Sequence, residues 1–207
     1  MAYTTIDNPE LYFQVKLYTG NGTDNTAYTF DGSEDMQPDL LWFKERSSTS
    51  DHALWDSVRG TNKKLEPSTT QADSTEDVIT FDSDGFSVDD HSQINQNTIT
   101  MVCWAWKAGT TSGITTNGST DITPSAYSFN TTSRISIAKY AGQTTAGQLA
   151  HGLGTTPTFH IIKKSSAIGN WQVYSKAVGN TATLTLNETY ATDANAYYYN
   201  NTDPDSV

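Results

Sequence analysis

The sequence predicts an all-β protein of two tandem, related β-sandwich units of jelly-roll-like type, the second incomplete, with a short N-terminal helix. The first observation is composition: Ser, Thr, Asn, Gly and aromatic residues, including 11 tyrosines, dominate the 207 residues, and helical periodicity is nearly absent. The second is a long segment, 38–60, that recurs at 157–179 without insertion or deletion. The third is that the second unit ends before it repeats the strands that close the first.

The repeated segment reads PDLLWFKERSSTSDHALWDSVRG in the first copy and PTFHIIKKSSAIGNWQVYSKAVG in the second. In each copy a proline precedes a mostly apolar run that ends at a lysine, and a second apolar run with an aromatic residue leads to a glycine. This pattern is typical of two strands joined by a polar turn. Because the shared positions serve packing and backbone geometry while the polar positions differ, the segment is interpreted as scaffold. The shared positions include Pro38, Trp55 and Gly60, with their equivalents Pro157, Tyr174 and Gly179.

The N-terminal segment, 1–12, carries a helix-start signal, which predicts a short helix or a turn. Asp7 or Asn8 can cap the helix, and Pro9 suits its first position. The apolar residues that follow either pack on the domain or attach the chain to a partner, and the sequence leaves both alternatives open. These candidate attachment residues are Leu11, Tyr12 and Phe13.

The first unit is expected at 13–109. It begins with a strand, FQVKLYTG at 13–20, and continues through the repeated strand pair. A hairpin is predicted at 78–88, with Asp84–Gly85 at its turn. The strand TITMVCWAWK at 98–107 is the most apolar in the chain, so we expect it to be central and buried on both faces.

The second unit is expected at 127–207, after a linker at 110–126 rich in Gly, Ser and Thr. It begins with a hairpin whose turn is NTTS at 130–133, and its strand ISIAKYAG at 135–142 matches 13–20. Counterparts of the first unit's later hairpin and apolar strand do not follow. Because unpaired strand edges promote association, we expect that the polypeptide continues beyond Val207 or that another chain supplies these strands.

The balance of charge excludes some partners. The formal net charge is −11, with 23 acidic and 12 basic residues, so nucleic acid is not an expected partner. No apolar run approaches the ~20 residues that span a bilayer, and no membrane insertion is expected. The N-terminus lacks the basic and apolar regions of a signal peptide. The single cysteine, Cys103, lies in an apolar run and is expected to be buried.

No stretch displays a reaction. An acidic group invites a calcium site, but its spacing lacks the calcium-loop pattern and a hairpin turn explains it; its members are Asp82, Asp84, Asp89 and Asp90. The four histidines are scattered without a zinc-ligand spacing, and no nucleophile motif occurs. We therefore expect no enzyme activity, no catalytic residues, no metal site and no cofactor.

A Tyr/Asn-rich stretch near the C-terminus is the most distinctive candidate binding surface. Tyrosine rings can stack on sugar faces while amides bond hydroxyl groups; the alternative is packing within the fold or a subunit contact. Three consecutive tyrosines in a strand would place at least one side chain inside. The candidate residues are Tyr190, Tyr197, Tyr198, Tyr199, Asn200 and Asn201.

Several motifs together carry a resemblance to a known family. They are KLYTGNGT, the repeated segment of the first copy, FDSDGFSV, CWAWKAG, HGLGTTP and YYYNNTDPDSV. From about residue 13 onward the chain resembles an uncharacterised repeat domain of virion proteins of tailed bacteriophages, especially phages of marine bacteria. The resemblance implies a particle component, often in tail fibres or other surface-exposed proteins. It implies no enzyme and no functional residues.

The expected function is therefore that of a non-enzymatic virion structural protein, the particle-proximal part of a tail fibre or host-contact protein. Its expected partners are other virion proteins and further copies of itself, with a trimer favoured, and it would assemble in the host cytoplasm. Two alternatives stay open: a glycan-binding module for host surface polysaccharide, and a capsid decoration protein.

Overall fold

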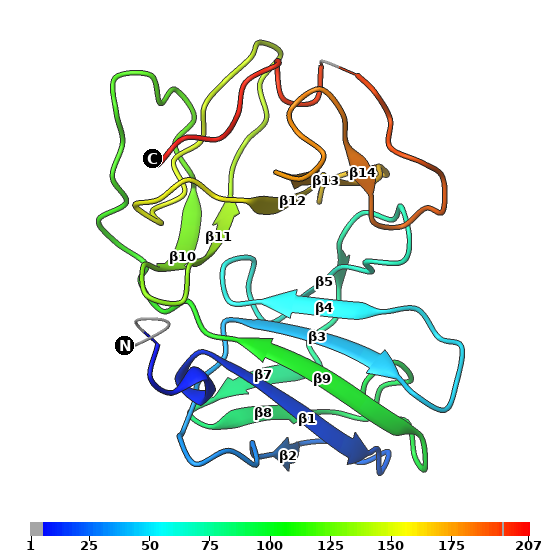
Figure 1. Ribbon diagram of the computed structural model, residues 1–207. Helices are drawn as coiled ribbons and strands as arrows, with labels where there is room; N and C mark the ends of the chain where they lie inside the picture. Colours follow the sequence, from blue (N-terminus) through cyan, green and yellow to red (C-terminus); the bar gives the residue numbers. More distant parts are fainter. Residues whose placement is uncertain (1–5, 196) are drawn as a thin grey trace.

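The computed structural model describes residues 6–195 and 197–207 and shows an all-β protein with several small antiparallel sheets (Figure 1). The predicted N-terminal helix is wrong in extent, because the described residues hold only a 3-10 turn, η1 (Pro9–Leu11). Asn8 caps this turn as predicted, since its side chain accepts a hydrogen bond from the Glu10 backbone N–H at 3.0 Å. The chain then enters a strand, which ends the turn. No helix in the described part of the chain has the length and apolar character needed to cross a membrane.

The largest sheet has four antiparallel strands in the order β1-β9-β3-β4. Their bounds are β1 (Phe13–Thr19), β9 (Thr100–Trp106), β3 (Leu40–Glu45) and β4 (Ala53–Asp56). The prediction that the most apolar strand is central is confirmed, because β9 pairs with β1 on one side and β3 on the other. The prediction that it is buried on both faces is wrong, because Trp104 and Trp106 on its outer face are only half-buried. Cys103 on β9 is fully buried and free, also as predicted.

A second sheet, β2-β8-β7, shares a core with the first. Its strands are β2 (Thr26–Tyr28), β8 (Gly85–Val88) and β7 (Ile79–Asp82). The predicted hairpin is confirmed, but its turn lies one residue earlier, at Ser83–Asp84, because Asp82 pairs with Gly85. A Cβ on Gly85, whose φ is +112°, would lie 2.2 Å from the Tyr28 carbonyl oxygen, so this position requires glycine.

The core between these two sheets is built largely from aromatic rings. Phe43 of β3 packs edge-to-face against Phe86 of β8, with ring centroids 5.1 Å apart, and against Trp55 of β4 at 6.0 Å. All three are fully buried. Edge-to-face contacts of this kind add to the stabilisation from apolar burial. A short two-stranded sheet, β5 (Lys63–Lys64) with β6 (Ser74–Thr75), follows β4.

The C-terminal part has two further sheets, drawn from yellow-green to orange in Figure 1. One is the predicted hairpin of β10 (Ala126–Asn130) and β11 (Ile135–Lys139). The Asn130 side chain accepts hydrogen bonds from the backbone N–H groups of Thr132 and Ser133, which fixes the turn. The other sheet has the order β12-β13-β14, with β12 (Phe159–Lys163), β13 (Trp171–Ser175) and β14 (Leu184–Thr185).

The two copies of the repeated segment form the same hairpin. Leu40 pairs with Asp56 in the first copy, and the equivalent Phe159 pairs with Ser175 in the second. Both copies end at a glycine with positive φ, +103° at Gly60 and +87° at Gly179. The shared register confirms that the repeat is structural. The finer expectations of tandem jelly rolls and of boundaries at 13–109, 110–126 and 127–207 stay predictions.

The two hairpins contact each other through their apolar outer faces. Trp171 of β13 packs with Leu54 of β4 and Leu65, and Trp42 and Ile161 border this cluster. The Trp171 indole N–H donates to the Glu66 and Thr69 carbonyl oxygens at 3.2 and 3.0 Å. The β3–β4 half of the large sheet's outer face is therefore covered by the second copy.

Candidate functional site

The other half of that outer face is open. In β1 the side chains alternate, so Tyr18 packs into the core while Phe13, Val15 and Leu17 point outward and are 37%, 41% and 55% exposed. On the neighbouring strand Trp106 lies opposite Phe13 and Trp104 opposite Val15. We call Phe13, Val15, Leu17, Trp104 and Trp106 the outer apolar face.

The outer apolar face continues into the candidate attachment residues. Leu11 is 36% exposed, Tyr12 is half-buried, and Phe13 packs on Trp106 with ring centroids 5.1 Å apart. Tyr12, Phe13 and Trp106 also line a cavity of about 210 Å³ beside Ile135 of β11. The structure thus brings Phe13 into a larger surface. Sequence reasoning missed the rest of it, although the alternation of Phe13, Val15 and Leu17 was a visible signal.

The three consecutive tyrosines lie in a turn rather than in the strand that the sequence suggested. The following Asn200 and Asn201 have φ of +51° and +52°, which a continuing strand does not allow. One tyrosine does point inward, as expected: the ring of Tyr199 packs edge-to-face on Tyr174, with centroids 5.2 Å apart.

The remaining candidate sugar-stacking tyrosines are on the surface. Tyr197 is 93% exposed, whereas Tyr190 and Tyr198 are 56% and 37% exposed. The hydroxyl of Tyr198 donates to Asp193 at 2.9 Å, and that of Tyr190 accepts from the Asn170 side chain at 3.2 Å. These bonds hold two rings in place while leaving much of each accessible, which suits a stacking surface as well as a subunit contact.

His160 is the most perturbed titratable group of the second copy. It takes the place of Leu41, because Leu41 pairs with Trp55 and His160 pairs with Tyr174. Its ring stacks on Tyr174 with centroids 4.9 Å apart, and its buried Nε2 has no hydrogen-bond partner among the described residues. Burial, with a smaller effect from the nearby His151, lowers the pKa of His160 to about 4.

Replacing His160 with leucine is expected to make the protein less sensitive to acid. Because the folded-state pKa is below the unfolded one, the unfolded chain binds the extra proton, and His160 costs stability as the pH falls from about 6.5 to about 4. The effect of His160→Leu on the free energy of unfolding should be more favourable at pH 5 than at pH 7.5, by about 1–2 kcal/mol. Urea unfolding at both pH values measures this, and an equal effect at both would contradict the assignment.

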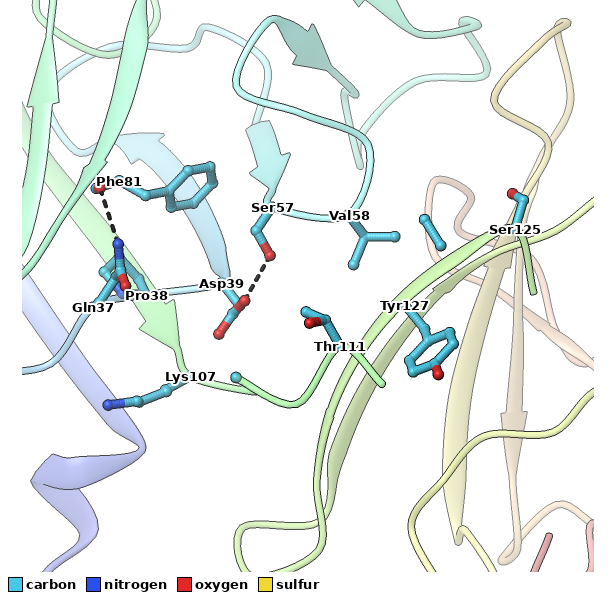
Figure 2. Close-up of a pocket in the computed structure, with 12 residues that line it drawn as sticks. Gln37, Pro38, Asp39, Ser57, Val58, Phe81, Lys107, Thr111, Ser125 and Tyr127 are labelled. Carbon is cyan, nitrogen blue, oxygen red and sulfur yellow. Dashed lines mark hydrogen bonds between the residues drawn. The ribbon is translucent and has the colours of Figure 1, made fainter. Parts of the chain in front are cut away.

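A larger cavity, of about 660 Å³, lies where the first copy meets β10. Figure 2 shows Asp39 and Ser57 on one side of it and Tyr127 on another. Asp39 is the only acidic residue among the described residues that line it, and both of its oxygens accept hydrogen bonds, from Ser57, Ser128 and the Ala108 N–H. The described lining residues therefore do not place a pair of carboxylates, as acid and base catalysis needs, in this cavity. The cavity lies at the contact between the first copy and the segment that contains β10.

A charged network lies beside the core of the first copy. The Lys64 ammonium group contacts Glu76 at 2.8 Å, Glu66 at 3.2 Å and the Gln93 side chain at 2.7 Å. Glu76 in turn contacts His91 at 2.8 Å. Burial lowers the pKa of His91, although the Glu76 carboxylate opposes this. Each of these side chains has a partner within the network, so we interpret the network as a structural anchor for the segment after β5.

The acidic residues considered for calcium are used as local hydrogen-bond acceptors. Asp84 accepts from the Met36 N–H at 3.2 Å, Asp89 from the Asn25 N–H at 2.9 Å, and Asp82 from the Ser87 hydroxyl at 2.7 Å. Across the residues that the structure describes, no three potential metal ligands lie together. The arrangement is that of a capped hairpin and its neighbouring loops.

The fold and its surfaces define an all-β protein of small antiparallel sheets with an open apolar face and a repeated hairpin. The chain belongs to a family described as a domain of unknown function (DUF7483), which matches residues 8–207. No curated protein and no solved structure matches it.

Proposed function

We propose that this chain is a non-enzymatic structural protein of a bacteriophage virion, the particle-proximal part of a tail fibre or host-contact protein built from tandem β-sandwich units. It assembles with other virion proteins and as a homotrimer. The phage assignment is supported by the motif resemblance. The structural role is supported above all by the outer apolar face, which spans the edge strand β1 and its neighbour β9 and offers an exposed apolar contact surface.

The residue types and their exposure favour a protein contact at this face. Phe13, Val15 and Leu17 lie in one row on β1, and the indoles of Trp104 and Trp106 lie beside them. Aromatic residues flanked by aliphatic ones are typical of the buried centre of protein interfaces. The covered half of the same sheet face shows what such a surface binds, since Trp171 and Ile161 pack there. We infer that another virion protein or subunit covers the open half.

Particles purified from the source of this sequence provide the test. Mass spectrometry of the particles should detect the chain, and gold-labelled antibodies should mark the tail. Label on the capsid would favour the decoration protein, and absence of the chain from the particles would contradict a virion role. A light-scattering mass of a single chain for the purified protein would count against the trimer.

A second function, glycan binding, is favoured by the exposed tyrosines. Tyr197 is almost fully exposed. Hydrogen bonds hold the other two rings in place: the Asn170 amide donates to the Tyr190 hydroxyl, and the Tyr198 hydroxyl donates to Asp193. Flat rings next to amides suit a host surface polysaccharide. A glycan array with the oligomeric protein tests this, with Tyr197→Ala combined with Tyr190→Ala as the matched variant. Binding lost in the variant supports the function, and no binding by either protein removes it.

A further inference from the structure

The repeat allows the strands of the second copy to be matched with those of the first. By sequence and pairing, β12 corresponds to β3 and β13 to β4, while β11 corresponds to β1. In the first copy β9 lies between β1 and β3 and pairs with both, so the strands form one sheet. In the second copy β11 pairs with β10 alone and β12 with β13 alone, so two separate sheets result. Within the described residues nothing takes the place of β9.

The edge of β12 that faces away from β13 is the edge that β3 gives to β9. In an antiparallel pair, every second residue directs its backbone N–H and C=O groups to the partner strand. Thr158 does so, because its carbonyl accepts from the Lys176 N–H, and the backbone groups of His160 and Ile162 therefore also point to β13. Those of Phe159, Ile161 and Lys163 point to the free edge. Their equivalents in β3 lie opposite β9 residues: Leu40 opposite Trp106, Trp42 opposite Trp104, and Lys44 opposite Val102.

The free edge of β11 shows the same correspondence. The backbone groups of Phe129 on β10 point away from β11, because both bond to Thr110. The backbone groups that point from β10 to β11 are therefore those of the alternate residues, whose partners on β11 are Ile135, Ile137 and Lys139. The backbone groups of Ser136 and Ala138 therefore face the opposite edge. Their equivalents in β1 are Gln14 and Lys16, which lie opposite Ala105 and Cys103 of β9. Among the residues that the structure describes, both edges that β9 satisfies in the first copy are thus without a strand partner in the second.

The side chains near these edges show the cost of the missing strand. Phe43 of β3 is fully buried, and its equivalent on β12, Ile162, is 39% exposed. Phe159, which begins β12, is 57% exposed. Exposed apolar residues beside unpaired backbone groups are the features of an edge that accepts another strand.

We propose that a further extended strand, from outside residues 6–207, inserts between β11 and β12, antiparallel to both, and joins them into one sheet as β9 does in the first copy. The occupant resembles β9: small or flexible apolar side chains such as Met101, Cys103 and Ala105 face the core, and larger ones alternate with them. It is free on both edges before it binds. The edge strand β1 of a second copy is a poorer occupant, because one of its edges already pairs with β9. It could pair with β11 or with β12 but not with both. This site does not depend on the proposed virion role.

A soluble peptide provides the probe: residues 98–107 of this chain, with Cys103→Ser and flanking lysines, carrying a fluorophore. We expect saturable binding to the whole protein by fluorescence anisotropy, together with slower amide hydrogen exchange at Ile161, Lys163 and Ala138. The same peptide with Trp104→Pro lacks a backbone donor in the middle of the strand and should bind at least about tenfold more weakly.

Two protein variants separate edge binding from loss of fold. Phe159→Pro removes an N–H on the free edge without removing a hydrogen bond to β13, whereas Phe159→Ala removes only the side chain. With unchanged circular dichroism, Phe159→Pro should weaken peptide binding about tenfold, and Phe159→Ala should weaken it less. No binding by the wild-type protein, or equal binding by both variants, would overturn the proposal. Concentration-dependent protection of the same amides without peptide would also overturn it, in favour of pairing between copies.

Discussion

Replacing Trp55 with alanine is expected to lower the free energy of unfolding by about 3–5 kcal/mol. The indole is fully buried in the core shared by the β1-β9-β3-β4 and β2-β8-β7 sheets. It packs edge-to-face against Phe43 at 6.0 Å and against His91 at 6.3 Å. Alanine leaves a cavity whose walls belong to both sheets and cannot collapse without moving them. Urea unfolding at pH 7.5 measures the loss.

The matched control is Trp55→Phe. The indole N–H has no hydrogen-bond partner among the described residues, so phenylalanine removes a buried donor that nothing satisfies while keeping most of the ring. We expect this variant to lose less than about half as much stability as Trp55→Ala. If the two variants lost equal stability, the indole N–H would have a partner, and the packing of the ring alone would not explain the effect of Trp55→Ala.

Replacing Asp39 with alanine should have the second-largest effect, a loss of about 2–4 kcal/mol. One carboxylate oxygen accepts from the Ser57 hydroxyl at 2.6 Å and the Ser128 hydroxyl at 3.0 Å. The other accepts from the Ala108 N–H at 2.9 Å. Ser128 and Ala108 are buried, so alanine leaves the Ala108 N–H and the Ser128 O–H without their acceptor, although the Ser128 oxygen still accepts from the Gly109 N–H at 2.8 Å. Because Asp39 joins β3 to β10, the substitution should also speed proteolysis within 110–126.

Asp39→Asn serves as the control, because the amide keeps one acceptor oxygen and nearly the same shape. We expect a smaller loss of stability and little change in proteolysis. If Asp39→Ala left both the unfolding free energy and the cleavage rate of 110–126 at wild-type values, Asp39 would not be the link between the first copy and β10.

Local patterns predicted most of the strands, because these strands are short apolar runs bounded by turn residues. The spacing shared by Pro38 and Pro157 predicted two hairpins of equal register, and the pairing of Leu40 with Asp56 and of Phe159 with Ser175 confirms it. The N-terminal helix failed because the Tyr12 carbonyl accepts a hydrogen bond from the Lys107 N–H, which commits the next residues to β1. No local pattern reveals that pairing.

The candidate surfaces were harder to predict because their exposure depends on distant parts of the chain. Trp42 and Trp104 lie side by side on one sheet face, yet Trp42 borders the cluster formed with Trp171, whereas Trp104 lies in the open half. The tyrosine stretch departs from a strand because Asn200 and Asn201 adopt positive φ. Which tyrosine is inside was therefore decided by a turn rather than by strand alternation.

The proposal that the outer apolar face attaches this chain to a particle is tested most directly by supplying a variant during particle assembly. Val15→Glu combined with Leu17→Glu places two charges on the open face without touching the core. The control is Ile168→Glu, which changes an apolar residue that is 67% exposed and lies elsewhere. With all proteins equally folded, the double variant should be missing from purified particles while the control is retained. Incorporation of the double variant at the wild-type level would contradict the proposal.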